Sequence, residues 1–201
     1  MNSPRLQTTL LAAVLLAAVP ASRGADELPS IFNGRDLAGW KVPDPNPFWK
    51  AVDGVLVGEN NPELKGSMLF TEASYGDVVF ETDARWSGEI DSGIMMRKPN
   101  VQVQIGVSRS LKKEMTCSFY VGKYPEESQA KEAGRLLKPG DWNRIRVEAR
   151  GTTFTVWLNG EKVSQLSDPK YAAPGPIGLQ IHGGLKMKVE FRNIRAKPLA
   201  P

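Results

Sequence analysis

Apolar and polar side chains alternate along most of this chain, and a period of two is the pattern of a β-strand with one buried face. Within residues 77–86, Phe80 and Thr82 fall on one face, whereas Glu81 and Asp83 fall on the other. Helical spacing, with apolar residues at i, i+3 and i+4, is almost absent. The sequence therefore predicts an all-β protein. Many short strands between Gly and Pro turns are typical of a jelly-roll sandwich of two antiparallel sheets.

Turn residues and the same alternation locate further strands and loops. Asn159-Gly160 predicts a tight hairpin, because both residues readily adopt the positive φ of a type I′ turn. Residues 126–137 lack a continuous apolar stripe and predict a surface loop with a helical turn. Prolines in residues 43–48 predict an extended loop. The remaining predicted strands are residues 101–107, 145–149, 154–158, 177–181 and 187–196.

The first 24 residues have the three parts of a secretory signal peptide. A short basic start ends at Arg5, an apolar run covers residues 9–19, and small residues surround Gly24. This run is well short of the ~20 residues that cross a bilayer as a helix, although an uncleaved anchor stays an alternative. We therefore expect residues 1–24 to be removed and residues 25–201 to form one domain. The protein is expected to be periplasmic or extracellular, with no membrane span.

Charge and cysteine content exclude some classes of function. Loss of Arg5 and Arg23 with the signal peptide lowers the formal net charge from +4 to +2. No basic run is interleaved with aromatic residues, so we expect no nucleic-acid partner. Cys117, the only cysteine, has no disulfide partner and is expected to be a buried, inert thiol. One histidine and no cysteine cluster disfavour Zn²⁺, so we expect no cofactor; a structural Ca²⁺ and the oligomeric state are left open.

Six short segments, taken together, resemble the 3-keto-disaccharide hydrolase domain family. They occur in the order of the family and together span essentially all of the mature chain: IFNGRDLAGW (31–40), DSGIMMR (91–97), GDWN (140–143), WLNG (157–160), GPIGLQIH (175–182) and VEFRNI (189–194). The resemblance implies a concanavalin A-like jelly roll, in which two curved antiparallel sheets hold a sugar on a concave face. It also implies hydrolysis of 3-keto-glycosides outside the cytoplasm.

One position departs from the family pattern. Members commonly carry a Tyr-Glu-x-Gln segment after the motif that ends at Arg97, whereas this chain has Val101-Gln102-Val103-Gln104. An amide at Gln102 cannot exchange a proton at neutral pH as a carboxylate can. Either this chain performs that task with another residue, or it has lost the task.

A ketone at C3 of a sugar offers its own route to cleavage. It acidifies the proton on C2, and removal of that proton lets the C1 oxygen leave by elimination before water adds back. This route needs a base that works near neutral pH and donors for the developing enolate oxygen. His182, the only histidine, is the candidate base and shares strand parity with Gln180, a candidate sugar ligand. The alternative is a histidine that only bonds a nearby turn.

Further polar side chains are candidate ligands of the sugar. Asp91 and Arg97 share parity on one strand, where we expect them to pair and to hold or polarise the sugar; the alternative is a purely structural ion pair. Asp91 is also a candidate catalytic residue. Gln102 and Gln104 face one side of another strand, and amides suit vicinal hydroxyl groups, although exposed glutamines without a ligand fit nearly as well.

Aromatic side chains are the other candidates. Tyr120 is expected to stack on a sugar ring or to fill a gap, and Trp49 follows the proline-rich loop and is expected to rim the cleft. The other tryptophans, assigned to core or strand-edge packing, are Trp40, Trp86, Trp142 and Trp157.

Three classes of function stay open at this stage. The first is a hydrolase of 3-keto-disaccharides or related glycosides. The second is a non-catalytic carbohydrate-binding module or accessory protein, and the third is a protein-interaction sandwich. Ordinary endo-glucanase chemistry is disfavoured, because Glu89 and Asp91 form a Glu-x-Asp pair that Gly93 and Ile94 follow in place of a second acid.

Overall fold

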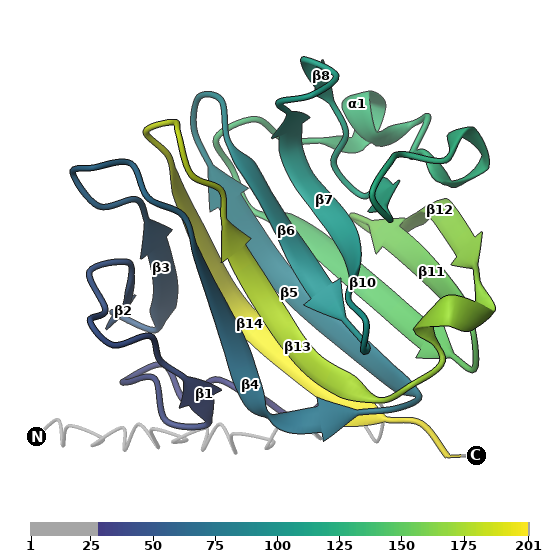
Figure 1. The fold of residues 1–201 in the computed structure, drawn as a ribbon, viewed down its shortest axis with the longest axis horizontal. Coiled ribbons are helices and arrows are strands. Elements are labelled where there is room, and N and C mark those ends of the chain that lie inside the picture. The colour runs from purple at the N-terminus through teal and green to yellow at the C-terminus, as the bar shows by residue number, and fades with distance from the viewer. Residues whose placement is uncertain (1–27, 201) are drawn as a thin grey trace, which may run out of the picture.

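Two antiparallel sheets of seven strands each pack face to face in the computed structural model, which describes residues 28–200 (Figure 1). The expected jelly-roll sandwich is therefore confirmed. The predicted signal peptide, residues 1–24, lies outside the described residues. No helix within residues 28–200 is long and apolar enough to span a membrane.

The first sheet contains most of the candidate site residues, on or beside its strands β6, β7, β9 and β13. Its strand order is β1-β4-β13-β6-β7-β8, and β9 also pairs with β7. The bounds are β1 (Trp40–Lys41), β4 (Ser67–Tyr75), β6 (Asp91–Met96), β7 (Val101–Ser108), β8 (Lys113–Glu114), β9 (Phe119–Tyr120) and β13 (Gly175–Ile181).

The second sheet has the order β12-β11-β10-β5-β14-β3-β2. Its predicted hairpin is confirmed, since Asn159 and Gly160 both have positive φ, at 51° and 94°. The bounds are β2 (Trp49–Val52), β3 (Val55–Glu59), β5 (Val78–Trp86), β10 (Asn143–Arg150), β11 (Thr153–Leu158), β12 (Glu161–Ser167) and β14 (Lys188–Pro198).

The core lies between the sheets and is built from the apolar half of the alternating pattern. Phe119 of β9 and Phe154 of β11 meet edge to face across it, with ring centroids 6.2 Å apart. Each such buried side chain stabilises the fold by ~1.5–3 kcal/mol. Cys117 is fully buried beside them in the core, and burial raises the pKa of its thiol well above the usual range. The expectation of a buried thiol is confirmed.

Helical structure is confined to short turns in the connections. Residues 126–137 contain a 3₁₀ turn, η1 (Glu126–Ser128), and one α-helical turn, α1 (Ala133–Leu136), as the sequence predicts. A second 3₁₀ turn, η2 (Pro169–Tyr171), precedes β13. Residues 43–48 have almost no regular structure, in agreement with the predicted loop. The long connection from β7 to β10 lies beside the first sheet in Figure 1 and supplies side chains to the site described next.

Candidate functional site

A hollow of about 420 Å³ on the outer face of the first sheet brings together most of the predicted site residues. Six of the eight candidates line it: Asp91, Gln102, Gln104, Tyr120, Gln180 and His182. Four further residues line the hollow without having been predicted: Ser108, Arg109, Ser110 and Tyr124. We call this hollow the polar site.

Strand register places the three glutamines together. Gln180 of β13 lies opposite Gly93 of β6, and Gly93 lies opposite Gln104 of β7. Gly93 forms the floor of the polar site, because a Cβ at this position would lie 2.8 Å from the amide nitrogen of Gln102. Only glycine therefore leaves room for the Gln102 side chain to lie across β6 and reach the neighbouring amides.

A chain of hydrogen bonds connects the amides to Asp91. Gln102 Nε2 donates to Gln104 Oε1 at 2.7 Å and to Gln180 Oε1 at 3.2 Å. Gln104 Nε2 in turn donates to Asp91 Oδ1 at 2.8 Å. Among the described residues, no partner bonds Gln102 Oε1 or Gln180 Nε2. The polar site therefore offers a free acceptor and a free donor side by side, which suits a pair of sugar hydroxyl groups.

Asp91 is a buried carboxylate at the inner end of this chain. Besides the bond from Gln104, its Oδ2 accepts from the backbone N–H of Arg109 at 3.3 Å. Because a carboxylate only accepts, its bond from Gln104 fixes which end of that side-chain amide faces Asp91, and Gln104 Oε1 is left to accept from Gln102. Within residues 28–200, no group of three or more His, Cys, Asp and Glu side chains is arranged to hold a metal ion.

His182 lies at the rim of the polar site and is exposed. Its backbone is fixed, since its N–H donates to the Asp91 carbonyl at 3.1 Å and its carbonyl accepts from Asn60 at 2.9 Å. Imidazole Nδ1 lies 2.8 Å from the carbonyl oxygen of Gly183. Because a carbonyl oxygen only accepts, Nδ1 carries a proton and Nε2 of the neutral ring is the free acceptor. In this tautomer the ring accepts a proton at Nε2, as a base must.

Two tyrosines form a wall of the polar site. The rings of Tyr120 and Tyr124 are tilted by 52° with centroids 5.0 Å apart. Burial raises the pKa of Tyr124 to about 12, and the charge of Asp91 adds to this rise while the nearby Ser108 hydroxyl opposes it. Tyr124 therefore stays a neutral phenol at physiological pH, available as a hydrogen-bond donor.

A second hollow of about 300 Å³ adjoins the polar site and shares Gln102 and Tyr120 with it. Its other walls come from the end of β6, the turn before β7 and η2, and include Met95, Asn100, Lys170 and Tyr171. We call the two adjoining hollows together the groove.

Arg97 lies outside the groove, and its expected pairing with Asp91 is wrong. A φ of +70° takes Arg97 out of the extended conformation of β6, so strand parity does not fix its side chain. The buried guanidinium donates to Asp77 Oδ1 at 3.0 Å and to the Gly151 carbonyl at 2.9 Å. The hydrogen bond from Arg97 to Asp77 is the main reason that the pKa of Asp77 lies below its usual value. Arg97 therefore joins loops of the two sheets and is no longer a candidate sugar ligand.

Trp49 is also misplaced by the sequence prediction, since it does not rim the cleft. It is buried at the start of β2, at the edge of the second sheet. Its ring covers Gly58 on the neighbouring strand, where a Cβ would come within 2.6 Å of the ring. Its Nε1 donates to Ser67 Oγ at 2.9 Å. Trp49 therefore belongs to the core and fills the space that Gly58 leaves.

The residues that sequence reasoning missed lie in the connection after β7. Arg109 is held by a bond from its Nη1 to the Gly183 carbonyl, at 2.7 Å, next to His182. Ser108 is the last residue of β7, and Tyr124 follows β9. Ser108 has the parity of Gln102 and Gln104 in β7, so the polar run Ser108-Arg109-Ser110 at a strand end was a signal for these three residues. Tyr124 lies outside any alternating pattern, and no such signal marked it.

A comparison with protein-family models finds a match over residues 27–197 to the 3-keto-alpha-glucoside-1,2-lyase-like domain. No curated protein matches the sequence. Among solved structures, one from Parabacteroides distasonis, described as a “putative glycosyl hydrolase”, is 24% identical with a TM-score of 0.64. The alignment covers 85% of this chain and 93% of that one.

Two further solved structures share the fold. A second Parabacteroides distasonis protein of the same description is 22% identical, with a TM-score of 0.62 over 80% of this chain and 94% of that one. The carbohydrate-binding module CBM66 from Bacillus subtilis is 16% identical, with a TM-score of 0.51 over 79% of this chain and 95% of that one. The sandwich is thus a scaffold shared by proteins with both kinds of description.

Proposed function

Because the chain belongs to the 3-keto-alpha-glucoside-1,2-lyase-like domain family, which is also the 3-keto-disaccharide hydrolase family, we propose that it cleaves 3-keto-disaccharides or related glycosides outside the cytoplasm. The observation that carries the proposal is the convergence of an imidazole with a free Nε2, a buried carboxylate and three amides on one hollow. The volume of that hollow, about 420 Å³, lies within the ~300–1,000 Å³ typical of small-molecule sites.

The proposed reaction is an elimination followed by hydration. His182 Nε2 removes the proton from C2, and the electron pair forms an enolate with the C3 ketone. The pair then moves to form the C1–C2 double bond, the bond between C1 and the glycosidic oxygen breaks, and the leaving oxygen takes the proton that His182 removed. Water adds to C1 and gives a proton to His182, which passes it to C2, so the overall change is hydrolysis. One base near neutral pH is sufficient for both proton transfers at C2.

Donors around the polar site suit the enolate intermediate. Gln180 Nε2 has free N–H groups, and the neutral phenol of Tyr124 supplies an O–H. Fixed donors of this kind stabilise negative charge as it develops on the ketone oxygen. In this arrangement the adjoining hollow, between Tyr120 and Lys170, receives the leaving group of the glycoside.

Turnover of a 3-keto-α-glucoside beside its unoxidised parent tests the proposal. We expect the purified protein to release the leaving alcohol from the keto sugar only, because the parent has no ketone to acidify its C2 proton. The two sugars present nearly the same hydroxyl groups, so the parent controls for binding alone. Equal cleavage of both sugars would rule out the elimination route.

A non-catalytic carbohydrate-binding module is the second candidate, and Gln102 favours it. This amide stands where family members commonly carry a glutamate, and it donates to two other amides as a ligand-binding network would. The shared fold of CBM66 is compatible with this role. Saturable binding of the keto sugar by calorimetry, without release of the leaving alcohol, would favour this candidate over the enzyme.

A further inference from the structure

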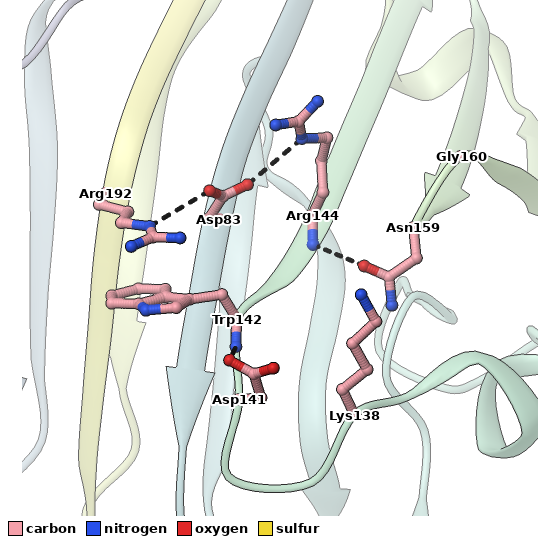
Figure 2. A pocket seen from close by; sticks show the side chains of 8 residues that line it. All are labelled: Asp83, Lys138, Asp141, Trp142, Arg144, Asn159, Gly160 and Arg192. Carbon is pink, nitrogen blue, oxygen red and sulfur yellow. Dashed lines mark hydrogen bonds and ion pairs between the residues drawn. The ribbon is translucent and has the colours of Figure 1, made fainter.

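A separate hollow of about 440 Å³ lies on the outer face of the second sheet, whereas the groove lies on the outer face of the first. It shares no residue with the groove. Its walls come from β5, β10, β14, the loop before β10 and the hairpin at Asn159. Figure 2 shows the lining residues: Asp83, Lys138, Asp141, Trp142, Arg144, Asn159, Gly160 and Arg192. We call it the cationic hollow.

A buried carboxylate holds two arginines at one wall. Asp83 Oδ1 accepts from Arg144 Nε at 3.3 Å, and Oδ2 accepts from Arg192 Nε at 3.3 Å and from Asn193 Nδ2 at 2.8 Å. Both arginines therefore bind Asp83 through Nε. Among the described residues, no hydrogen bond engages their terminal nitrogens. Two guanidinium groups are thus positioned by one carboxylate and keep most of their donors unused.

Trp142 fixes one of these guanidinium groups further. The central carbon of Arg192 lies 4.1 Å from the ring centroid, and that of Arg85 lies 4.4 Å from it. Arg85 is also neutralised by Glu190, at 2.7 Å. Because guanidinium groups already contact the indole ring, stacking on a sugar is not its role here. Recognition in the cationic hollow is therefore polar.

Lys138 completes the positive wall. Its backbone is held by Asn143, which accepts from its N–H at 2.8 Å and donates to its carbonyl at 3.0 Å. In Figure 2 its side chain reaches toward Asn159, and no carboxylate of the described residues forms an ion pair with it. Asp83 already accepts three hydrogen bonds. Asp141, the other lining carboxylate, accepts one, at its Oδ1 from the Trp142 N–H at 2.7 Å, and so keeps more acceptor capacity to spare.

We propose that the cationic hollow binds a sugar that carries a carboxylate or sulfate group, as part of an acidic polysaccharide. The oxyanion binds at Lys138 Nζ, and the free donors of Arg144 and Arg192 add to the positive potential of the hollow, since guanidinium and ammonium groups are the usual partners of such anions. The volume far exceeds that of one oxyanion, and the Asp141 carboxylate repels a bare anion but accepts hydroxyl groups. A hydroxyl-rich ligand with one negative group satisfies both features.

Calorimetric titration with oligogalacturonate, dextran sulfate and neutral dextran tests this site. The intact protein is expected to bind at least one of the two charged ligands, which identifies the anion, and not the neutral one. Replacing Lys138 with glutamine is expected to weaken that binding about tenfold through loss of one charge-assisted hydrogen bond. Binding is also expected to weaken with added salt, because the hollow is open to solvent.

Lys131→Gln is the matched control, because this exposed lysine lies seven positions earlier in the same connection, outside the hollow, and the charge change is identical. The affinity of Lys131→Gln for the charged ligand is expected to stay within about twofold of that of the wild type. The melting temperature of each variant shows whether it folds. This control does not depend on any activity toward keto sugars. Absence of binding to both charged ligands, or equal losses in the two variants, would overturn the proposal.

Discussion

Replacing His182 with asparagine is expected to slow cleavage of a 3-keto-α-glucoside by about 10²–10⁴-fold, the usual contribution of a general base. Asparagine keeps an N–H for the Gly183 carbonyl, which Nδ1 now contacts at 2.8 Å, but offers no group that takes up a proton. Initial rates of the wild type and the variant, compared at the same pH and substrate concentration, measure the loss.

The control for this variant is Lys186→Gln, which changes an exposed side chain in the same turn before β14. It is expected to keep the wild-type rate. Ligand affinity of His182→Asn is expected to stay close to that of the wild type, because the amides and tyrosines of the polar site are unchanged. Full activity in His182→Asn would remove the imidazole from the role of base, and a parallel Asp91→Asn variant would then show whether the carboxylate performs it.

Replacing Arg97 with methionine is expected to lower the free energy of unfolding by about 3–5 kcal/mol. The reason is that the groups which now accept hydrogen bonds from the buried guanidinium would lose their donor. The guanidinium now bonds Asp77, the Gly151 carbonyl and, at 3.4 Å, the Ala172 carbonyl, and it is 3% exposed. Chemical denaturation measures the loss. Arg97→Lys keeps the charge without the planar fork and is expected to lie between the wild type and methionine.

The ion pair of Arg97 and Asp77 is also expected to make the stability of the fold depend on pH in the acid range. The pKa of Asp77 is lowered in the folded protein, so its stabilising contribution is present above the usual carboxyl pKa of 3.8 and is lost as pH falls through the lowered value. Arg97→Met is expected to reduce this acid-dependent loss. As a control, Arg135→Gln removes an exposed partner of Glu132 and is expected to leave the free energy of unfolding nearly unchanged. Equal stability of Arg97→Met and wild type would contradict the structural role.

Strand periodicity predicted the fold well because each sheet buries one face. Alternation located β5, β7, β10, β11, β13 and β14, and the Asn159-Gly160 pair located the tight hairpin between β11 and β12. Shorter edge strands such as β1, β8 and β9, at two residues each, carry too few side chains for a period to be read. Their positions are set by pairing with longer neighbours, which depends on contacts distant in sequence.

Strand parity predicted the site residues that lie on regular strands, and it failed for residues beyond the strand ends. Gln102 with Gln104, and Gln180 with His182, share faces of regular strands, and antiparallel pairing through Gly93 brings the two sets together. At Arg97 a positive φ ends the extended conformation, so counting residues along β6 gave the wrong neighbour. Trp49 was misjudged because the space above Gly58 exists only once β2 and β3 are paired.

The chemistry proposed for the groove is tested most directly by running the cleavage of a 3-keto-α-glucoside in deuterium oxide. Elimination followed by hydration replaces the C2 proton with one from solvent, so the released keto sugar is expected to carry one deuterium at C2. Mass spectrometry and NMR detect this label, and product incubated with His182→Asn gives the background exchange. Cleavage with the original C2 proton retained would show that no base in the groove removes it.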